Sequence, residues 1–444
     1  AASVSAVVGA LALQGTLPAH AATGFTYEMV RSFDSVSNNT QGEILCSFAF
    51  NDIGQLAYLG QRWDYSTAQP SIVTSLYFWD GTSEQLVYQD ANPNTGTHYP
   101  AFDCGGNRIG LSNTGLISAS SVVTEPNTVE VLYFRANQGE IGRGDVSYMI
   151  TRGNLNDSGE VGYFGSYLGA PILGTLRYGT SNRTYGVVPQ NVGFGYGKPI
   201  VNELGQVAAM VQGSQQDGYY YTGIVDFDPR WPPSPSSNPL TILSRFTPIG
   251  RADEWPEVFG TPGLNNLGYA SFTTQARGPI YPNTRFRVAL VTPDRQRVSI
   301  LADDTVFTRN AAPTTPSWLN NLNQVLIGIS GVEADNPNAG ESALWLIDAA
   351  KQPLLVARSG ETIEAGDQSV WSLYFGSNTQ GGGYDNVVND VGDVAFAAVY
   401  YLEGTNTGGN GIFIARPAPG LTPANPVLPR GQEGEPDCKP RHLQ

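Results

Sequence analysis

Carboxylates, arginines and aromatic side chains gather in four long segments, residues 90–108, 245–262, 303–317 and 359–386, which separate short apolar runs. Paired carboxylates can serve as general acid and base, and aromatic rings beside charged groups bind sugars or peptides. A tryptophan in such a segment also has a simpler use, which is to fill a gap in the core. The candidate ligand-binding residues are His98, Tyr99, Asp103, Arg251, Asp253, Glu254, Trp255, Trp371, Tyr384 and Asp385.

Known catalytic signatures are missing from the chain. It has no G-x-S-x-G elbow, no H-E-x-x-H, no P-loop and no G-x-G-x-x-G between a strand and a helix. Its three histidines are His20, His98 and His442, so a Ser-His-Asp enzyme would depend on His98. The sequence therefore assigns no catalytic residue and predicts no cofactor.

One stretch has part of the pattern of a calcium loop. Asn154, Asn156 and Ser158 place oxygen atoms at alternate positions before Gly159. These side chains are neutral, however, and the closing glutamate of such loops is absent. We expect a turn here and no metal site.

A short phrase, Asn-x-x-Gly followed by small apolar residues, recurs seven times and indicates a repeat architecture. Gly at the fourth place supplies a positive φ, and the side chain at the first place bonds to nearby backbone, so each copy predicts a tight turn between two strands. The average spacing of about 56 residues suits one four-stranded propeller blade with long loops. The copies begin at Asn51, Ser112, Asn156, Asn202, Asn265, Asn320 and Asn389, and Asn323 replaces the glycine in the sixth copy.

The last repeat lacks a strand, because the chain turns proline-rich after residue 416. Residues 25–32 stand before the first repeat and read as an extra strand. We predict an all-β chain, a seven-bladed β-propeller whose ring is closed by this N-terminal strand in the last blade, which leaves no free sheet edge. Two unrelated β-sandwiches are the alternative.

The two ends differ from the propeller region, which we place at residues 24–416. Residues 1–23 are apolar and end in a small-x-small site at Ala19 and Ala21, as a secretory signal peptide does. The alternative is that this segment is retained. Residues 417–444 form a proline-rich tail. If both ends belong to the mature protein, we expect them to mediate self-association.

Charge and cysteine content restrict the partners and the compartment. The net charge of −15 disfavours nucleic acid, because the surface repels phosphate backbones. Cys46 and Cys104 precede the first two turns, on neighbouring blades, and a disulfide between them suits an oxidising compartment. Two buried free thiols are the alternative, and Cys438 lies in the tail.

The phrase that begins at Asn389 and ends at Phe396, with residues 343–346 and 355–361 ahead of it, resembles the NxxGxxAF tandem-repeat proteins of bacteria. The phrase at residues 156–163 is similar to the exported HAF-repeat proteins. The resemblance covers roughly residues 41–416 and implies export, with no established activity and no catalytic residues to carry over. Many of those proteins have a C-terminal anchor, from which the polar tail of this chain departs.

Two functions follow from the sequence. The first is a secreted or cell-surface propeller without enzymatic activity that binds a carbohydrate or peptide or assembles with copies of itself. The second is a secreted hydrolase or lyase. It would work with Asp103, Asp253, Glu254 or Asp385 at the channel mouth, which is the end of the propeller's central channel where the four long segments emerge, opposite the repeat turns. A metal site or a strongly shifted carboxylate pair at that mouth would favour the enzyme.

Overall fold

The structure is a computed structural model of the whole chain. The residues it describes are 24–34, 42–64, 66, 71–90, 109–123, 128–146, 149–167, 170–179, 183–187, 192–194, 198–214, 220–227, 240–245, 255–278, 281–294, 298–303, 312–313, 318–330, 342–366, 368–374, 387–402 and 408–418. The signal-like segment and most of the proline-rich tail lie outside them.

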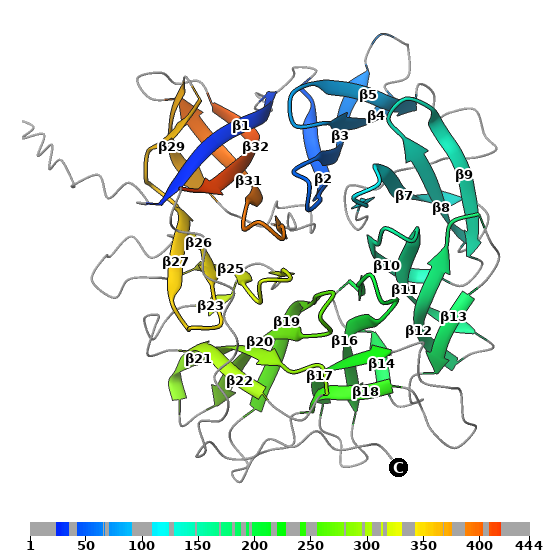
Figure 1. Ribbon diagram of the computed structural model, residues 1–444, viewed down its shortest axis with the longest axis vertical. Coiled ribbons are helices and arrows are strands. Elements are labelled where there is room, and N and C mark those ends of the chain that lie inside the picture. The colour runs from blue at the N-terminus through cyan, green and yellow to red at the C-terminus, as the bar shows by residue number, and fades with distance from the viewer. Residues whose placement is uncertain are drawn as a thin grey trace, which may run out of the picture.

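The described residues form strands and no helix, and the strands build seven sheets arranged around a centre as a β-propeller (Figure 1). None of the described residues belongs to a helix that is long and apolar enough to span a membrane. We number the sheets in chain order. The first three sheets contain β2 (Ile44–Phe50), β3 (Leu56–Asp64), β4 (Ser71–Trp79) and β5 (Glu84–Asp90); β6 (Gly110–Leu111), β7 (Leu116–Val123), β8 (Thr128–Arg135) and β9 (Gly139–Val146); and β10 (Met149–Leu155), β11 (Glu160–Tyr167), β12 (Ala170–Arg177) and β13 (Arg183–Val187).

The other four sheets follow the same plan, but the inner strand is divided in the fourth, sixth and seventh, and the seventh also contains β1 and β28. The fourth and fifth contain β14 (Val192–Phe194), β15 (Ile200–Val201), β16 (Val207–Ser214), β17 (Tyr220–Phe227) and β18 (Leu240–Arg245); and β19 (Trp255–Leu264), β20 (Ala270–Gly278), β21 (Tyr281–Val291) and β22 (Val298–Asp303). The sixth and seventh contain β23 (Ala312–Pro313), β24 (Trp318–Leu319), β25 (Val325–Ser330), β26 (Ser342–Ile347) and β27 (Pro353–Arg358); and β1 (Phe25–Asp34), β28 (Ile363–Ala365), β29 (Gln368–Tyr374), β30 (Val387–Val388), β31 (Val394–Leu402) and β32 (Gly408–Pro417).

The repeated phrase forms the turn between the two innermost strands of every sheet, as the sequence predicts. In each turn the fourth residue has a positive φ, between 59° and 90°, and its N–H donates to the carbonyl of the first residue at 3.0–3.1 Å. Asn323 adopts this backbone at φ 59°, because asparagine tolerates the left-handed region better than most residues. The prediction of tight turns with positive φ is therefore confirmed.

The first strand of the chain joins the last sheet. β1 runs antiparallel to β32, from Phe25 opposite Pro417 to Asp34 opposite Gly409. Its start also meets β28, where Tyr27 is the partner of Ala365. The ends of the described chain are thus hydrogen-bonded to each other within one sheet (Figure 1).

Three of the segments expected as loops contain strands, and the 303–317 segment holds the shortest of them, the two-residue β23. The 359–386 segment holds the hairpin of β28 and β29, whose turn uses Gly366 at φ 69°. The 245–262 segment contains the start of β19, where Trp255 pairs with Arg277. The sequence pattern misses the β28–β29 hairpin and the start of β19, because their charged and aromatic residues interrupt the alternation that marks a strand.

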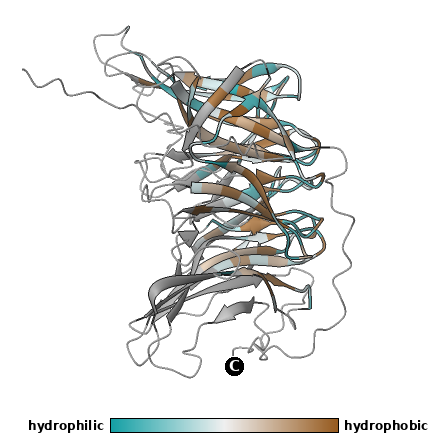
Figure 2. Cartoon of the chain, turned by 90° about the vertical axis from the view of Figure 1, so that its left-hand side faces the viewer, coloured by the Kyte–Doolittle hydropathy of each residue, from teal (hydrophilic) through white to brown (hydrophobic). Residues whose placement is uncertain are grey.

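The core lies between neighbouring sheets rather than within one. A cluster with Leu59 and Ile117 joins the first and second sheets, and another with Phe33 and Ile414 joins the seventh and first. Figure 2 shows the result, with hydrophobic residues along the stacked strands and hydrophilic ones at the turns. Each sheet therefore depends on its neighbours, which holds the seven repeat turns close together at the centre.

Candidate functional site

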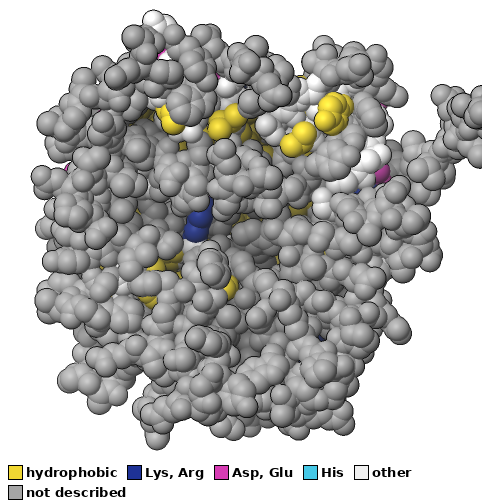
Figure 3. Space-filling model, turned by 180° about the vertical axis from the view of Figure 1, so that it is seen from behind, with side chains coloured by type: hydrophobic (Ala, Val, Ile, Leu, Met, Phe, Trp, Pro, Cys, Tyr) yellow, Lys and Arg dark blue, Asp and Glu magenta, His cyan; other side chains and the backbone are white. Residues whose placement is uncertain are grey.

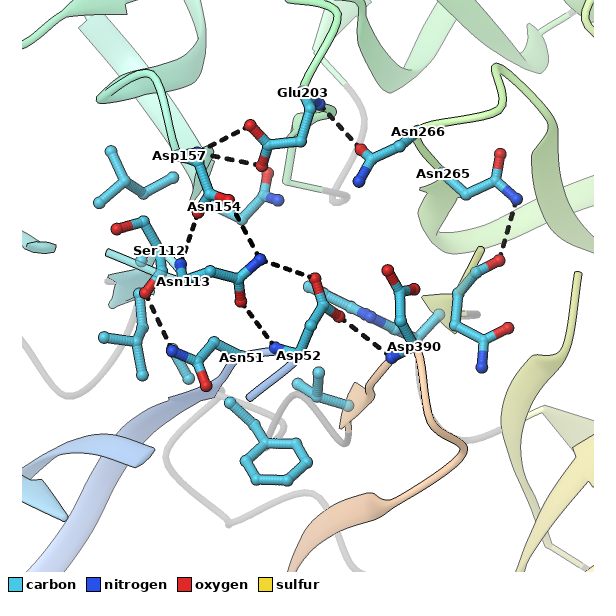
Figure 4. Close-up of a pocket in the computed structure, with 18 of the residues that line it drawn as sticks. Asn51, Asp52, Ser112, Asn113, Asn154, Asp157, Glu203, Asn265, Asn266 and Asp390 are labelled. Atoms are coloured by element: carbon cyan, nitrogen blue, oxygen red, sulfur yellow. Dashed lines mark hydrogen bonds between the residues drawn. The ribbon is translucent and has the colours of Figure 1, made fainter. Parts of the chain in front are cut away.

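The seven repeat turns, which we call the turn ring, surround a central cavity of about 100 Å³ (Figure 4). The inner strands bring them there, because each turn follows the last residue of an inner strand. Second-position side chains such as Asp52 and Asn113 line the cavity together with apolar residues of the inner strands such as Phe50 and Leu111. This cavity is the candidate functional site.

The first-position side chains form the inner level of the ring, and all seven are buried. The asparagines among them bond to the backbone of their own turn, as when Gln55 N–H donates to Asn51 Oδ1 at 2.8 Å. Five of their Nδ2 groups also reach the carbonyl of the next turn at 2.8–3.0 Å. These bonds run from Asn51 to Ser112, Asn156 to Asn202, Asn202 to Asn265, Asn265 to Asn320 and Asn320 to Asn389.

The second-position residues form a closed circuit. In each turn the backbone N–H of this residue donates to a side-chain oxygen of the same residue in the next turn, at 2.5–3.0 Å. The circuit runs from Asp52 to Asn113, Asp157, Glu203, Asn266, Asn321, Asp390 and back to Asp52. Every turn donates a backbone N–H to the next turn and accepts one from the turn before it. The circuit therefore ties the first repeat to the last.

The circuit includes four carboxylates, Asp52, Asp157, Glu203 and Asp390. Asn113 bridges two of them, since its Nδ2 donates to Asp52 Oδ2 at 3.0 Å and to Asp157 Oδ2 at 3.1 Å. Asn321 donates to Asp390 in the same way. Each carboxylate oxygen in the ring therefore accepts at least one hydrogen bond, which is the pattern of acids that fix backbone geometry.

Burial affects two of these acids most. It raises the pKa of Glu203 to about 7, although the Asp157 N–H opposes the shift, and the charges of Asp157 and Asp52 add to it. Burial also raises the pKa of Asp52, and the charge of Asp390 adds a smaller increase. A carboxyl group that titrates near neutral pH in a cavity is a functional candidate.

An aromatic residue sits in the wall of the cavity. Trp318 in β24 is half-buried and packs against three core clusters, those between the fourth and fifth, the sixth and seventh, and the seventh and first sheets. Trp318 thus contacts residues on both sides of its own sheet. The structure gives it the role of core filler that the sequence left open for tryptophans.

Most of the candidate residues from the sequence lie outside the described residues. His98, Tyr99, Asp103, Arg251, Asp253, Glu254, Tyr384 and Asp385 are all in this group. Trp255 and Trp371 lie on β19 and β29, but their side chains are not described. Figure 3 shows the face seen from behind, where few side chains belong to the described residues, and we assign no site to it.

Two other expectations concern covalent and metal chemistry. Cys46 is disulfide-bonded, and Cys104, its expected partner, lies outside the described residues. The stretch with part of a calcium-loop pattern forms a repeat turn, and Asn154 uses its amide on the backbone of Val201, at 2.7 and 2.9 Å. Within the described parts of the chain, no group of three or more His, Cys, Asp or Glu residues is placed to hold a metal ion.

The carboxylates of the turn ring are functional candidates that sequence reasoning missed. The repeat pattern assigns Asp52, Asp157, Glu203 and Asp390 only to tight turns. A usable signal was present, because all four occupy the second place of the repeat. Aligning the seven copies by that position would have placed the four acids in one ring.

No family model matches this sequence, and no curated protein matches it. Solved structures do resemble it. A protein of unknown function from Dyadobacter fermentans is 9% identical, with 90% of this chain and 100% of that one covered and a TM-score of 0.37. The polysaccharide lyase Uly1 is 8% identical over 87% and 92%, with a TM-score of 0.45. TolB from Acinetobacter baumannii is 11% identical over 82% and 80%, with a TM-score of 0.34. At these identities the similarity concerns the fold alone.

Proposed function

We propose that this chain is an exported, non-enzymatic β-propeller that binds a partner outside the cell, with the turn ring as its binding face. The observation that carries this proposal is the circuit of second-position residues. Its acids accept backbone N–H groups and so serve as structural groups, while the ring surrounds a cavity at the centre of the molecule. Propellers without a catalytic constellation serve as platforms.

The architecture within this proposal is a seven-bladed ring closed by β1. Seven sheets, seven turns in one hydrogen-bond circuit, and the pairing of β1 with β32 support it. Membership of the NxxGxxAF tandem-repeat group is part of the same proposal, and so is a carbohydrate or peptide ligand.

Export is tested on the mature protein in its native host. Residues 1–23 have the features of a signal peptide. We therefore expect to find the protein outside the cytoplasm, with the mass of a chain that begins at Ala22. An unprocessed protein in the cytoplasm would rule out export. Light scattering on the same sample tests self-association through the termini, since a monomeric mass would remove that part of the proposal.

An enzyme is the second candidate, and one observation favours it. Glu203 titrates near neutral pH inside the cavity, beside Asp157, and could act as a general base. The activities to test are hydrolysis or β-elimination of acidic and neutral polysaccharides, and hydrolysis of peptides. Activity that disappears in Glu203→Gln, while the melting temperature is unchanged, would replace the binding proposal with a hydrolase or lyase.

A further inference from the structure

The third position of the repeat turns carries exposed apolar side chains. Ile53 is 61% exposed, Leu204 41%, Leu267 52% and Val391 54%. Leu322 occupies the same place and is half-buried. We call these five residues the apolar crescent. Isolated exposed apolar residues are ordinary, but a group at one position of a repeat marks an interaction site.

The five residues come from consecutive turns. The hydrogen-bond circuit passes from the turn of Leu204 to those of Leu267, Leu322, Val391 and Ile53 without a break. The remaining two turns carry Thr114 and Ser158 at this place. The crescent therefore spans five consecutive turns around the central cavity, and the polar Thr114 and Ser158 occupy the other two.

The turn itself does not require an apolar residue at its third position. The turns of Thr114 and Ser158 make the same closing bond, from the fourth N–H to the first carbonyl, at 3.1 Å in both. Their glycines also have the same positive φ, 74° and 78°. Exposure of four of these five apolar side chains is thus unexplained by folding and points to a partner.

The central cavity beside the crescent is lined by acidic side chains. Asp52, Glu203 and Asp390 lie in turns of the crescent, and Asp157 in the next turn. Two described arginines have other partners at the turns: Arg135 donates to the carbonyl of Thr114, and Arg416 pairs with Glu28 and Asp393. Between described residues, no salt bridge reaches the four carboxylates of the ring. The remaining negative charge favours a cationic ligand.

We infer that the turn face docks a cationic amphipathic peptide segment of a partner protein, with its aliphatic or aromatic side chains on the apolar crescent and its lysine or arginine at the carboxylates. This inference rests on the proposed binding function and names the chemistry of the partner. An anionic lipid surface attracts basic protein surfaces. This chain carries a net charge of −15, so such a surface would repel it.

The test measures binding of the full chain to two labelled synthetic peptides by fluorescence anisotropy. One peptide alternates Lys and Leu pairs to form an amphipathic helix, and the other replaces every Lys with Glu. The crescent variant is Leu204→Thr with Leu267→Thr, which copies the residue found naturally at position 114. The matched control is Leu86→Thr, because Leu86 is 47% exposed and lies on β5, outside the turn ring.

We expect the Lys peptide to bind the wild type and the control equally, and the crescent variant about tenfold or more weakly. The Glu peptide should not bind. Equal affinity of the crescent variant and the wild type, at unchanged melting temperature, would overturn the inference. So would equal binding of the two peptides, or tighter binding of the wild type to phosphatidylserine vesicles than to the Lys peptide.

Failure of this inference can be separated from failure of the proposed function. A glycan and peptide array probed with the same variants provides the second measurement. A ligand retained by the crescent variant would leave the binding function in place and remove the crescent as its site. Catalytic turnover that depends on Glu203 would instead remove the proposed binding function.

Discussion

Two regions hold the ring together, and they use different chemistry. The turn ring repeats one geometry seven times, with backbone groups bonded to amide and carboxylate side chains. The second region, which we call the closing seam, lies where β1 meets the first sheet and comprises Arg31, Glu43, Tyr58, Tyr77 and Glu84. Arg31 pairs with Glu43 at 3.2 Å and with Glu84 at 2.8 Å, and lies 5.3 Å from the Tyr77 ring centroid.

The remaining contacts of the seam are also made by side chains. The Tyr77 hydroxyl donates to Glu43 at 3.1 Å, and the Tyr58 hydroxyl donates to Glu84. The two tyrosine rings stack at 5.1 Å. The contacts of the turn ring are made by positions that recur in every repeat. The strand β1 lies outside the repeats, so the seam that joins it to the first sheet depends on side chains that the repeats do not share. The ion pairs of the seam should therefore respond to salt.

The largest effect should come from the apolar part of the closure. Phe33 in β1 is 1% exposed and belongs to the cluster that joins the seventh and first sheets. Phe33→Ala should lower the free energy of unfolding by about 3–5 kcal/mol, because it opens a cavity between two sheets. Thermal unfolding followed by circular dichroism measures the loss. Glu28→Ala on the same strand is the control, and a comparable loss there would show that β1 as a whole is sensitive.

Breaking the turn ring at its inner level should cost slightly less. Asn202 Nδ2 donates to the Asn265 carbonyl at 2.8 Å and to Gln206 at 2.7 Å, and Asn202 Oδ1 accepts from Gln206 N–H at 3.0 Å. Asn202→Ala leaves these buried groups unpaired, and we expect a loss of about 2–4 kcal/mol. Asn202→Ser should lose less, because Ser112 accepts the equivalent backbone N–H at 3.1 Å. Equal losses would mean that the side chain fills space and its bonds contribute little.

The backbone of the turns gives a separate measurement. Gly54 has φ 82°, and a Cβ added there would meet no atom within 4 Å. Gly54→Val should therefore cost about 1–3 kcal/mol through backbone strain alone. Chemical denaturation against wild type measures it, and Gly54→Asn is the control, since Asn323 adopts the same conformation. No difference between valine and asparagine would contradict the strain argument.

The charged part of the seam should matter least for stability in physiological salt. Arg31 is 32% exposed on its side chain, and Glu43 and Glu84 are partly exposed. Solvent screening limits the loss in Arg31→Gln to about 1 kcal/mol or less, and this loss should shrink further at high salt. Melting temperatures in low and high salt test it. A loss unaffected by salt would assign the contribution of Arg31 to packing on the aromatic rings.

The pH dependence of stability sharpens the same comparison. The folded-state pKa of Glu203 is raised to about 7 from a reference near 4.5. Between these values the native state binds more protons than the unfolded state, so stability is highest below the lower value and falls as the pH rises toward 7. The fall in melting temperature over this window should be smaller in Glu203→Gln. An identical fall would shift the effect to Asp52 or Asp393, whose pKa values burial also raises.

Local structure was readable from the sequence where one residue type meets one backbone requirement. The glycines of the repeat predict positive φ because other residues are strained there, and the structure has that conformation in the turns. The asparagine at the first place predicts side-chain bonds to its own turn. The local sequence pattern does not predict β28 or the start of β19, where sheet contacts outweigh a weak local pattern.

By itself the sequence determined that this chain is an all-β protein built from turns repeated at blade spacing, because repeat length and turn chemistry are local properties. Only the tertiary structure decided that the second residues of these turns meet in one circuit, and that Asp52 and Asp390, 338 residues apart, are neighbours. The same closure sets the apolar crescent beside the acids and raises the pKa of Glu203. Burial and proximity belong to the assembled ring, so no single repeat encodes them.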